Sequence, residues 1–376
     1  MAKQIHYNMD NIEKEHAQIN LIVGEKSNGK SYQVKHKKGV LPYVNLLNKL
    51  EKENIVNESY KNDERFILLR RWREDLSSLW IERYFSDVDV ERITNGKYNI
   101  ITCYRKELFL GIYNVETGKI ERGAKIGYVM ALSTEQHYSG GSFLDVKRII
   151  FEEFMERGNY VKGDNEPDLL MFLYSTIDRK RGTTELWLVG NSVTKVCPYI
   201  HAWGLDDIFR NIKQGQIKTK IIDNGTNKIK IAVEFCGSSG GNKMTIGNAS
   251  KMIDGGAWQT SPQPHLPGSY KDYKKLYRVC FYYKHFTFIG ELLVDKENQY
   301  CWFIYPKYDK IKEKTIVFSD MVNISPYWQR DIYNISIKND KLKKLFIDTF
   351  RENMIFYSTD LCGTDFKQCI DFMIKK

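Results

Sequence analysis

The hydrophobic pattern of the first half of the chain predicts a buried sheet. Short apolar runs occupy residues 19–23, 64–69, 148–153 and 185–189, and polar or turn-forming residues separate them. Runs of this length are typical of strands that are covered on both faces, as in a parallel sheet flanked by helices. The pattern therefore indicates an α/β domain.

Helices are predicted between these strands. Residues 30–38 follow the first run, and residues 168–181 precede the last one. Residues 75–85 have the spacing of an amphipathic helix, and one face of it would carry Leu76, Leu79, Trp80 and Tyr84. Residues 98–133 instead alternate in three segments divided by turn residues, which predicts a small antiparallel addition to the sheet.

The residues after the first apolar run match a phosphate-binding loop. The pattern G-x-x-x-x-G-K-S is complete, and its positions are filled by Gly24, Glu25, Lys26, Ser27, Asn28, Gly29, Lys30 and Ser31. The two glycines permit a turn whose backbone N–H groups surround a phosphate at a helix N-terminus. We expect the lysine to reach the β- and γ-phosphates of ATP and the serine hydroxyl to contact Mg²⁺.

Two further strand ends carry candidate chemistry. Residues 148–151 lead into Glu152 and Glu153, the form taken by a Walker B strand with an added catalytic glutamate. The first acid would hold Mg²⁺ through water, and the second would orient and polarise the attacking water. Asn191 follows the run 185–189, where a polar side chain can sense the γ-phosphate. A plain turn asparagine is the alternative interpretation.

Charge is shared unevenly along the chain. Lys+Arg and Asp+Glu number 31 and 30 in residues 1–212, but 26 and 17 in residues 213–376. A basic second half beside a neutral nucleotide-binding half suggests a polyanionic partner, most simply nucleic acid. Solvated lysines that keep a protein soluble produce the same imbalance and remain the alternative.

The chain is long enough for two domains and a linker. Residues 236–270 are rich in glycine and contain three prolines, a composition typical of a linker or a mobile lid. Residues 1–235 are therefore expected to form the nucleotide-binding domain. Residues 271–376 are expected to form a second domain, with strands first and a helix afterwards.

Membrane insertion, secretion and disulfide bonding are not expected. No apolar stretch reaches about 18 residues, and the N-terminus has no apolar region typical of a signal peptide. The seven cysteines are odd in number, scattered, and never form C-x-x-C. This distribution is typical of reduced thiols rather than of disulfides or zinc ligands.

In order and spacing, these motifs resemble the genome-packaging ATPases of small tailed phages, of the phi-twenty-nine encapsidation type. The resemblance covers most of the chain, and beyond the phosphate loop it includes residues 5–8, 70–73, 149–154, 176–181, 191, 198–199 and 277–305. It implies an additional-strand (ASCE) P-loop fold with a central parallel sheet. It also implies ATP and Mg²⁺ as cofactors and a homomeric ring, usually a pentamer, on a capsid portal.

The resemblance assigns roles to single residues. Arg179 matches the arginine finger that one subunit donates to the γ-phosphate of its neighbour, and Arg73 matches a basic residue that can also act in trans. Tyr7 and Asn8 match the segment beside the adenine. Glu152 departs from the family, which usually has Asp at the magnesium position, so the respective roles of the two acids stay open.

The arginines allow two interpretations from sequence alone. Arg179 also fits a solvated helix end, where the helix dipole favours a cation. Arg70 and Arg71 can contact either phosphates or structural carboxylates, and the sequence does not choose between them.

The C-terminal segments resemble the RNase H-like nuclease domain of larger packaging terminases. Two-metal cleavage needs clustered carboxylates, and the first predicted strand, residues 277–283, has none. We therefore expect a small α+β domain that lacks nuclease activity. Its basic residues can contact DNA, a capsid RNA or the portal, and some only face solvent: Lys271, Lys274, Lys275, Lys307, Lys310, Lys312, Lys314, Lys341, Lys343 and Lys344.

The sequence thus predicts an ATPase that moves double-stranded viral DNA into a preformed capsid. It would act in the host cytoplasm and transiently on the procapsid, with DNA, copies of itself and the portal as partners. Whether a packaging RNA joins them is left open by the sequence. A viral helicase or recombination ATPase is one alternative, and it predicts aromatic stacking on single strands. A nucleotide-gated DNA-binding switch that barely hydrolyses ATP is the other.

Overall fold

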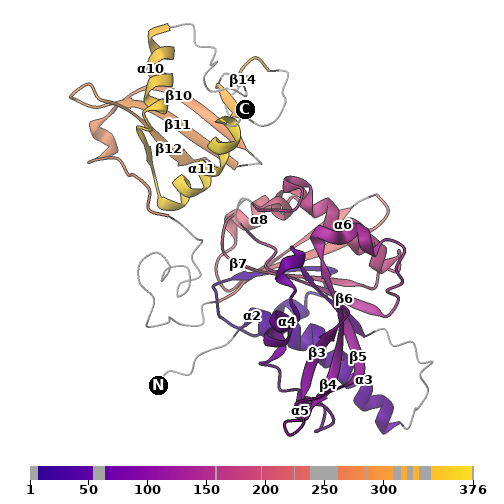
Figure 1. The fold of residues 1–376 in the computed structure, drawn as a ribbon. Coiled ribbons are helices and arrows are strands. Elements are labelled where there is room, and N and C mark those ends of the chain that lie inside the picture. The colour runs from indigo at the N-terminus through magenta and orange to yellow at the C-terminus, as the bar shows by residue number, and fades with distance from the viewer. Residues whose placement is uncertain are drawn as a thin grey trace. The chain divides into compact units, whose positions relative to one another are not determined.

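The computed structural model divides into two compact units, residues 1–257 and 258–376 (Figure 1). It describes residues 7–53, 64–156, 159–195, 197–223, 225–237, 261–283, 286–307, 315–319, 325–329 and 340–374. The centre of the predicted linker, residues 238–260, lies outside this set. So do residues 5 and 6 of the segment 5–8 and three of the lysines named above, Lys310, Lys312 and Lys314.

The first unit is built on a nine-stranded sheet. Its strands are, in spatial order, β3 (Ile100–Tyr104), β4 (Glu107–Tyr113), β5 (Ile120–Ala131), β2 (Arg65–Arg70), β6 (Val146–Glu152), β7 (Glu185–Asn191), β1 (Ile19–Gly24), β9 (Lys228–Phe235) and β8 (Gln216–Asp223). The six strands from β5 to β9 run parallel. The predicted apolar strands and the mixed α/β architecture are thereby confirmed.

The predicted antiparallel addition is also present. β4 pairs antiparallel with both β3 and β5, and β5 continues into a parallel pairing with β2. β5 therefore belongs both to the antiparallel addition and to the parallel part of the sheet, and it joins these two parts. Further along the sheet, β7 lies between β1 and β6. The carboxyl ends of these three parallel strands therefore lie side by side.

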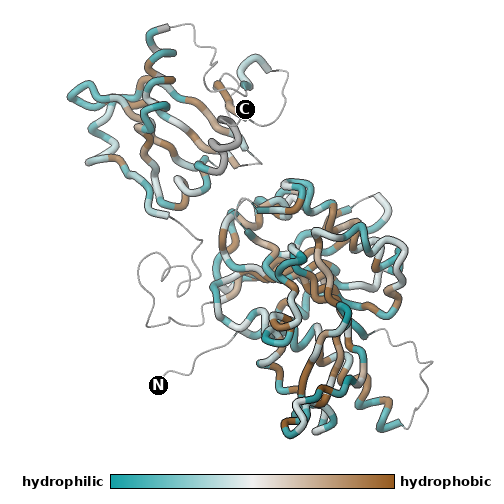
Figure 2. The backbone as a smooth tube through the Cα atoms, viewed as in Figure 1, coloured by the Kyte–Doolittle hydropathy of each residue, from teal (hydrophilic) through white to brown (hydrophobic). Residues whose placement is uncertain are grey.

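Helices cover both faces of this sheet. After β1 the chain forms α2 (Lys30–Val34), the π-helix η1 (Lys35–Val40) and α3 (Leu41–Lys52). Ile150 of β6 lies next to Gly39 in η1, whereas the following residue, Phe151, meets Tyr199 in α7 (Pro198–Ala202). Successive strand residues point to opposite faces, so η1 and α7 lie on opposite sides. Figure 2 shows apolar residues gathered along the strands between them.

The short helices of this unit lie in its connections. They are α1 (Asp10–Glu13), η2 (Arg73–Asp75), α4 (Ser78–Phe85), α5 (Val90–Ile93), η3 (Leu132–Tyr138), η4 (Gly163–Asn165), α6 (Glu166–Asp178) and α8 (Asp206–Asn211). Two of them, α4 and α6, correspond to helices predicted from the sequence, and both differ from the prediction.

The predicted apolar face of α4 was wrong. The helix begins at Ser78, after Ser77 accepts a hydrogen bond from the backbone N–H of Trp80, so Leu76 precedes it. Ile81 and Phe85 are the buried residues of α4, while Leu79 is 58% exposed. The Tyr84 side chain is directed instead towards the end of β6, as described below.

The predicted extension of α6 to Arg181 was also wrong, because the helix ends at Asp178. The Asp178 carboxylate accepts hydrogen bonds from the backbone N–H groups of residues 182–184. These bonds compete with continuation of the helix and turn the chain back towards β7. Arg179 and Lys180 consequently have positive φ angles of 48° and 61°.

The second unit contains a six-stranded sheet with two longer helices. The strand order is β14 (Trp328–Gln329), β13 (Val317–Ser319), β10 (Lys274–Tyr283), β11 (Phe286–Val294), β12 (Tyr300–Pro306) and β15 (Ile355–Tyr357). β10, β11 and β12 run antiparallel, β13 lies parallel to β10, and β15 lies parallel to β12. The 3-10 helix η5 (Tyr270–Asp272) precedes β10.

Aromatic residues from strands and helices form the core of the second unit. The Phe281 ring of β10 meets Phe366 of α11 (Asp360–Ile374) at 4.8 Å and Phe350 of α10 (Asp340–Arg351) at 6.3 Å. Residues 261–268 pack against the rest of this unit, since the backbone N–H of Tyr357 donates to the carbonyl oxygen of Pro264. The last part of the predicted linker is therefore tied to the second unit.

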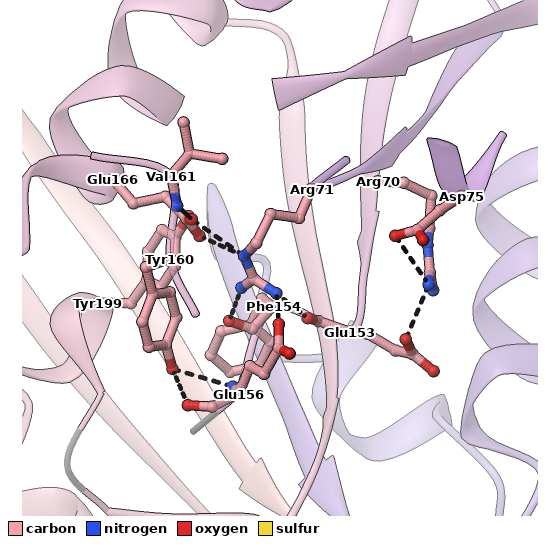
Figure 3. A network of polar contacts seen from close by, with 10 residues as sticks. All are labelled: Arg70, Arg71, Asp75, Glu153, Phe154, Glu156, Tyr160, Val161, Glu166 and Tyr199. Atoms are coloured by element: carbon pink, nitrogen blue, oxygen red, sulfur yellow. Dashed lines mark hydrogen bonds and ion pairs between the residues drawn. The ribbon is translucent and has the colours of Figure 1, made fainter. Parts of the chain in front are cut away.

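A buried arginine organises the segment that follows β6 (Figure 3). Arg71 comes directly after β2 and is 3% exposed. Its Nε donates to both carboxylate oxygens of Glu166, at 3.0 and 2.9 Å. Its Nη1 donates to the carboxylate of Glu156 and the carbonyl oxygen of Glu153, and Nη2 donates to the carbonyl oxygen of Phe154.

Glu166, the main partner of Arg71, is completely buried at the start of α6. The Tyr199 hydroxyl donates to it at 2.7 Å and the backbone N–H of Val161 at 2.5 Å. Burial raises the pKa of Glu166, and the contacts with Arg71 and Tyr199 oppose this shift. The network thus joins β2, the residues after β6, α6 and α7 through one buried charge pair.

We expect Arg71→Ala to lower the free energy of unfolding of the chain by about 3–5 kcal/mol, because it leaves the Glu166 carboxylate buried without its cation. Arg92→Ala is the matched control, since Arg92 forms an exposed pair with Asp89 and should contribute below about 1 kcal/mol. Urea unfolding of the full chain measures both values. Equal effects of the two substitutions would contradict the role given to the network.

Candidate nucleotide-binding site

The predicted phosphate loop connects β1 to α2, as its sequence requires. Gly29 has a φ of 93°, a left-handed conformation that favours glycine. A Cβ atom on Gly24 would lie 2.8 Å from the Cβ atom of Cys236, which follows β9. Gly29 is therefore required by its backbone conformation and Gly24 by the close approach of Cys236, and the loop lies at the carboxyl end of β1.

Lys30 is held across this loop. Its Nζ donates to the carbonyl oxygen of Glu25 at 2.6 Å and to Oδ1 of Asn191 at 2.8 Å. Burial lowers the pKa of Lys30, and nearby groups that include Glu152 oppose the shift. Asn191 ends β7, directly beside β1. The predicted sensor and the phosphate-loop lysine therefore lie in contact.

Glu152 lies between two hydroxyl groups. Ser31 Oγ donates to its Oε2 at 2.9 Å, and the Tyr84 hydroxyl donates to its Oε1 at 2.7 Å. Burial raises the pKa of Glu152, while these two hydrogen bonds oppose the shift. Hydroxyl and carboxylate oxygens are the ligands that Mg²⁺ prefers. Ser31 and Glu152 thus form a donor set that fits this ion.

Glu153 has a different environment from Glu152. It follows the last residue of β6 with a φ of 57°, and its side chain is 59% exposed. Arg70 Nη2 donates to its Oε2 at 2.8 Å and lies 3.4 Å from Oδ2 of Asp75 (Figure 3). Arg70 and Arg71 therefore both contact carboxylates, and contact of either with a phosphate stays a prediction.

Two hollows adjoin these residues. One of about 420 Å³ is lined by residues 26–31, by Trp80 and Tyr84 of α4, and by the two acids at the end of β6. The other, of about 450 Å³, lies on the Arg71 side of Glu153. Arg70, Glu152, Glu153 and Asn191 line both. Glu153 can therefore face a phosphate in one hollow and a group that enters through the other.

The residues predicted beside the adenine lie near the loop but outside these hollows. Tyr7 is 8% exposed, and its hydroxyl donates to Glu234 Oε2 at 2.6 Å. Its backbone N–H donates to the carbonyl oxygen of Asn28 in the phosphate loop. Asn8 is exposed and pairs with Asp10. Contact of either side chain with a base stays a prediction.

The two arginines predicted to act in trans do not line the hollows. Arg73 is exposed in η2. Arg179 is exposed after α6, and its Nη2 donates to the carbonyl oxygen of Gly141 at 2.6 Å. The neighbouring Arg181 donates to the carbonyl oxygen of Val146, the first residue of β6. Arg179 thus lies near the amino end of β6, whereas the acids lie at its carboxyl end.

Sequence reasoning missed the contribution of α4 to the site. Tyr84 contacts Glu152, and Trp80 stacks on Tyr84 with ring centroids 5.1 Å apart. The sequence shows two aromatic residues four positions apart after β2, a spacing that fits an apolar core face equally well. Among the described residues, no helix has the length and apolar character needed to cross a membrane.

Comparison with known proteins identifies relatives of this chain. Residues 1–211 match the family model of the Podovirus DNA encapsidation protein (Gp16). The DNA packaging protein of Bacillus phage phi29 is 26% identical over 207 residues, which cover 53% of this chain and 50% of that protein. The DNA packaging protein of Bacillus phage B103 is 26% identical over 188 residues, which cover 50% of this chain and 48% of that protein.

A solved structure shares the fold. The bacteriophage Phi-29 viral genome packaging motor assembly contains a chain that is 20% identical with a TM-score of 0.52, covering 98% of this chain and 99% of that one. By sequence, the chain spans about half the length of the relatives it matches. The family model extends over more than half of the chain and includes the phosphate loop, both acids and Asn191. The chain therefore belongs to the Podovirus DNA encapsidation protein (Gp16) family.

Proposed function

We propose that this chain is an ATP-driven motor that moves double-stranded viral DNA into a preformed capsid. One observation carries the proposal: a phosphate loop, a buried acid and an exposed acid meet at the carboxyl ends of β1 and β6, two parallel strands with β7 between them. That edge is where ligands bind in open α/β sheets. Membership of the encapsidation family supports DNA as the cargo, and relatives named as DNA packaging proteins support packaging as the task.

Lys30, Ser31 and Glu152 would bind the nucleotide and its metal ion. The Lys30 ammonium would exchange its present acceptors, Glu25 and Asn191, for β- and γ-phosphate oxygens. Ser31 and Glu152 would hold Mg²⁺, which neutralises charge on the phosphates when bound. The contact between these two side chains supports this assignment, because each presents an oxygen to the same point.

Glu153 would act on the attacking water. Its exposed carboxylate borders both hollows, so it can accept a hydrogen bond from a water molecule beside the γ-phosphate. Arg70 now occupies Oε2 of this carboxylate, and hydrolysis would require the acid to turn from the arginine towards the water. Asn191, in contact with Lys30, is proposed to report whether the γ-phosphate is present.

The strand order supports the finer assignment of this unit to the additional-strand (ASCE) class of P-loop ATPases. β7 separates the phosphate-loop strand β1 from the acidic strand β6, which is the feature that defines the class. Arg179 is proposed to act as a finger on a neighbouring copy, with Arg73 as a second residue in trans. A homomeric ring, a pentamer by resemblance, would then complete each site with residues of the next subunit.

The second unit is proposed to be an RNase H-like domain without nuclease activity. Three antiparallel strands, β12, β11 and β10, are followed by β13 and β14 on the β10 side, a strand order that supports this fold. β10 contains no acid, and the described residues include no cluster of three side chains that could bind a metal ion. Lys271, Lys274, Lys275, Lys341 and Lys344 are exposed and available to DNA, a packaging RNA or the portal.

We expect Glu153→Gln to retain ATP binding and to lower steady-state ATP hydrolysis by about 10²–10⁴-fold, because an amide cannot polarise the water. Glu74→Gln, an exposed acid in η2, is the control and should hydrolyse ATP at the wild-type rate. Hydrolysis is measured by phosphate release with duplex DNA. Unchanged turnover with an intact DNA-binding cycle would favour a nucleotide-gated switch instead.

We expect ATP turnover per subunit to rise with protein concentration and with duplex DNA, since the finger comes from a neighbour. Arg179→Ala should lower this turnover about 1,000-fold in assembled rings. Arg92→Ala is the matched control, because Arg92 is an exposed arginine paired with Asp89 three residues away. Turnover that is flat with concentration and unaffected by Arg179→Ala would contradict catalysis in trans.

A further inference from the structure

The buried acid of the site has one partner for each carboxylate oxygen. Oε2 of Glu152 accepts from Ser31, and Oε1 accepts from Tyr84. A buried carboxylate loses several hydrogen bonds to water, so both oxygens need donors. The Tyr84 contact fixes Oε1 on the α4 side, and this leaves Oε2 directed at the serine that ends the phosphate loop. Tyr84 therefore sets the orientation of the carboxylate.

Tyr84 is itself held in a stack of rings and cations. Trp80 lies parallel to its ring within 20°, and the Lys35 ammonium lies 4.5 Å from the ring centroid. The Arg70 guanidinium covers the Trp80 ring at 4.9 Å. Contacts of this kind favour a fixed ring position. We call Arg70, Trp80, Tyr84 and Lys35 the cation–aromatic column.

The column connects parts of the site that are distant in sequence. Lys35 begins η1, directly after α2, and also pairs with Asp87 at 2.5 Å. Arg70, at the other end, ends β2 and donates to Glu153. Tyr84 stands between them and donates to Glu152. The position of the metal-binding acid is therefore tied to the helix after the phosphate loop and to the strand that holds the second acid.

The side-chain length of Glu152 is consistent with this arrangement. At the end of β6 a glutamate reaches both the Ser31 hydroxyl and the Tyr84 hydroxyl at hydrogen-bonding distance. Both oxygen–oxygen distances are those of ordinary hydrogen bonds. An aspartate is one methylene shorter and would lose at least one of these contacts unless the backbone moved. The departure from aspartate at this position is thereby given a structural reason within this chain.

We propose that Tyr84 is a positioning residue for Mg²⁺ binding, which acts by fixing the carboxylate of Glu152. The inference rests on the proposed function, because it takes Ser31 and Glu152 as the magnesium ligands. Groups that orient metal ligands typically change metal affinity 10- to 100-fold when they are removed. Tyr84 would thus determine, through its hydrogen bond to Glu152, how strongly Mg²⁺ promotes nucleotide binding.

Calorimetric titration of the full chain with ADP, once with Mg²⁺ and once with EDTA, tests this inference. The ratio of the two dissociation constants measures how much Mg²⁺ promotes binding. We expect Tyr84→Phe to lower this ratio about tenfold and to leave the constant in EDTA unchanged. Tyr174→Phe is the matched control, because it removes a hydroxyl that donates to the carbonyl oxygen of Thr184 at the far end of the unit.

A second pair of variants tests whether Tyr84 acts through Glu152. Glu152→Asp should also lower the ratio, and the double variant should lower it by less than the product of the two single effects. An unchanged ratio in Tyr84→Phe, equal weakening with and without Mg²⁺, or independent effects in the double variant would overturn the inference. If ADP fails to bind the wild-type chain at all, the proposed function is overturned as well.

Discussion

The pairing of Arg71 with Glu166 is the interaction on which the arrangement of the site depends. Removing two charges from water costs several kcal/mol per ion, and the cost is offset only when nearly every donor finds an acceptor. The Nε of Arg71 donates to Glu166, while Nη1 and Nη2 donate to the backbone carbonyl oxygens of Glu153 and Phe154. The chain after β6 must therefore turn around this side chain, which gives Glu153 its positive φ and directs its carboxylate outward.

The same requirement couples the other buried charges of the site. Lys30 is satisfied by an amide from β7, and Glu152 by hydroxyls from α2 and α4. Each charged group thus takes its partner from a different element of the sheet or its helices. A change in the position of one strand end would consequently alter the hydrogen bonding of the others, so the side chains at this edge of the sheet depend on one another.

The sequence predicted the strands and the phosphate loop because both depend on local patterns. The roles of α4 and Arg71 depend on partners far along the chain, and no local pattern distinguishes an aromatic residue in a core from one that contacts an acid. Trp80 and Tyr84 were assigned to an apolar face for this reason. The end of α6 was misplaced because the Asp178 side chain competes for backbone N–H groups, an effect that apolar periodicity does not contain.

The position of Arg179 bears on how a complete site can form. β6 runs from Val146, which accepts a hydrogen bond from Arg181 two residues after this arginine, to Glu152 at the opposite end of the strand. Seven residues at about 3.3 Å each separate the two ends by roughly 20 Å, well beyond the length of an arginine side chain. A finger at Arg179 can therefore serve only another copy. Such a contact joins two different surfaces head to tail, and repeating it by a rotation that closes produces a ring.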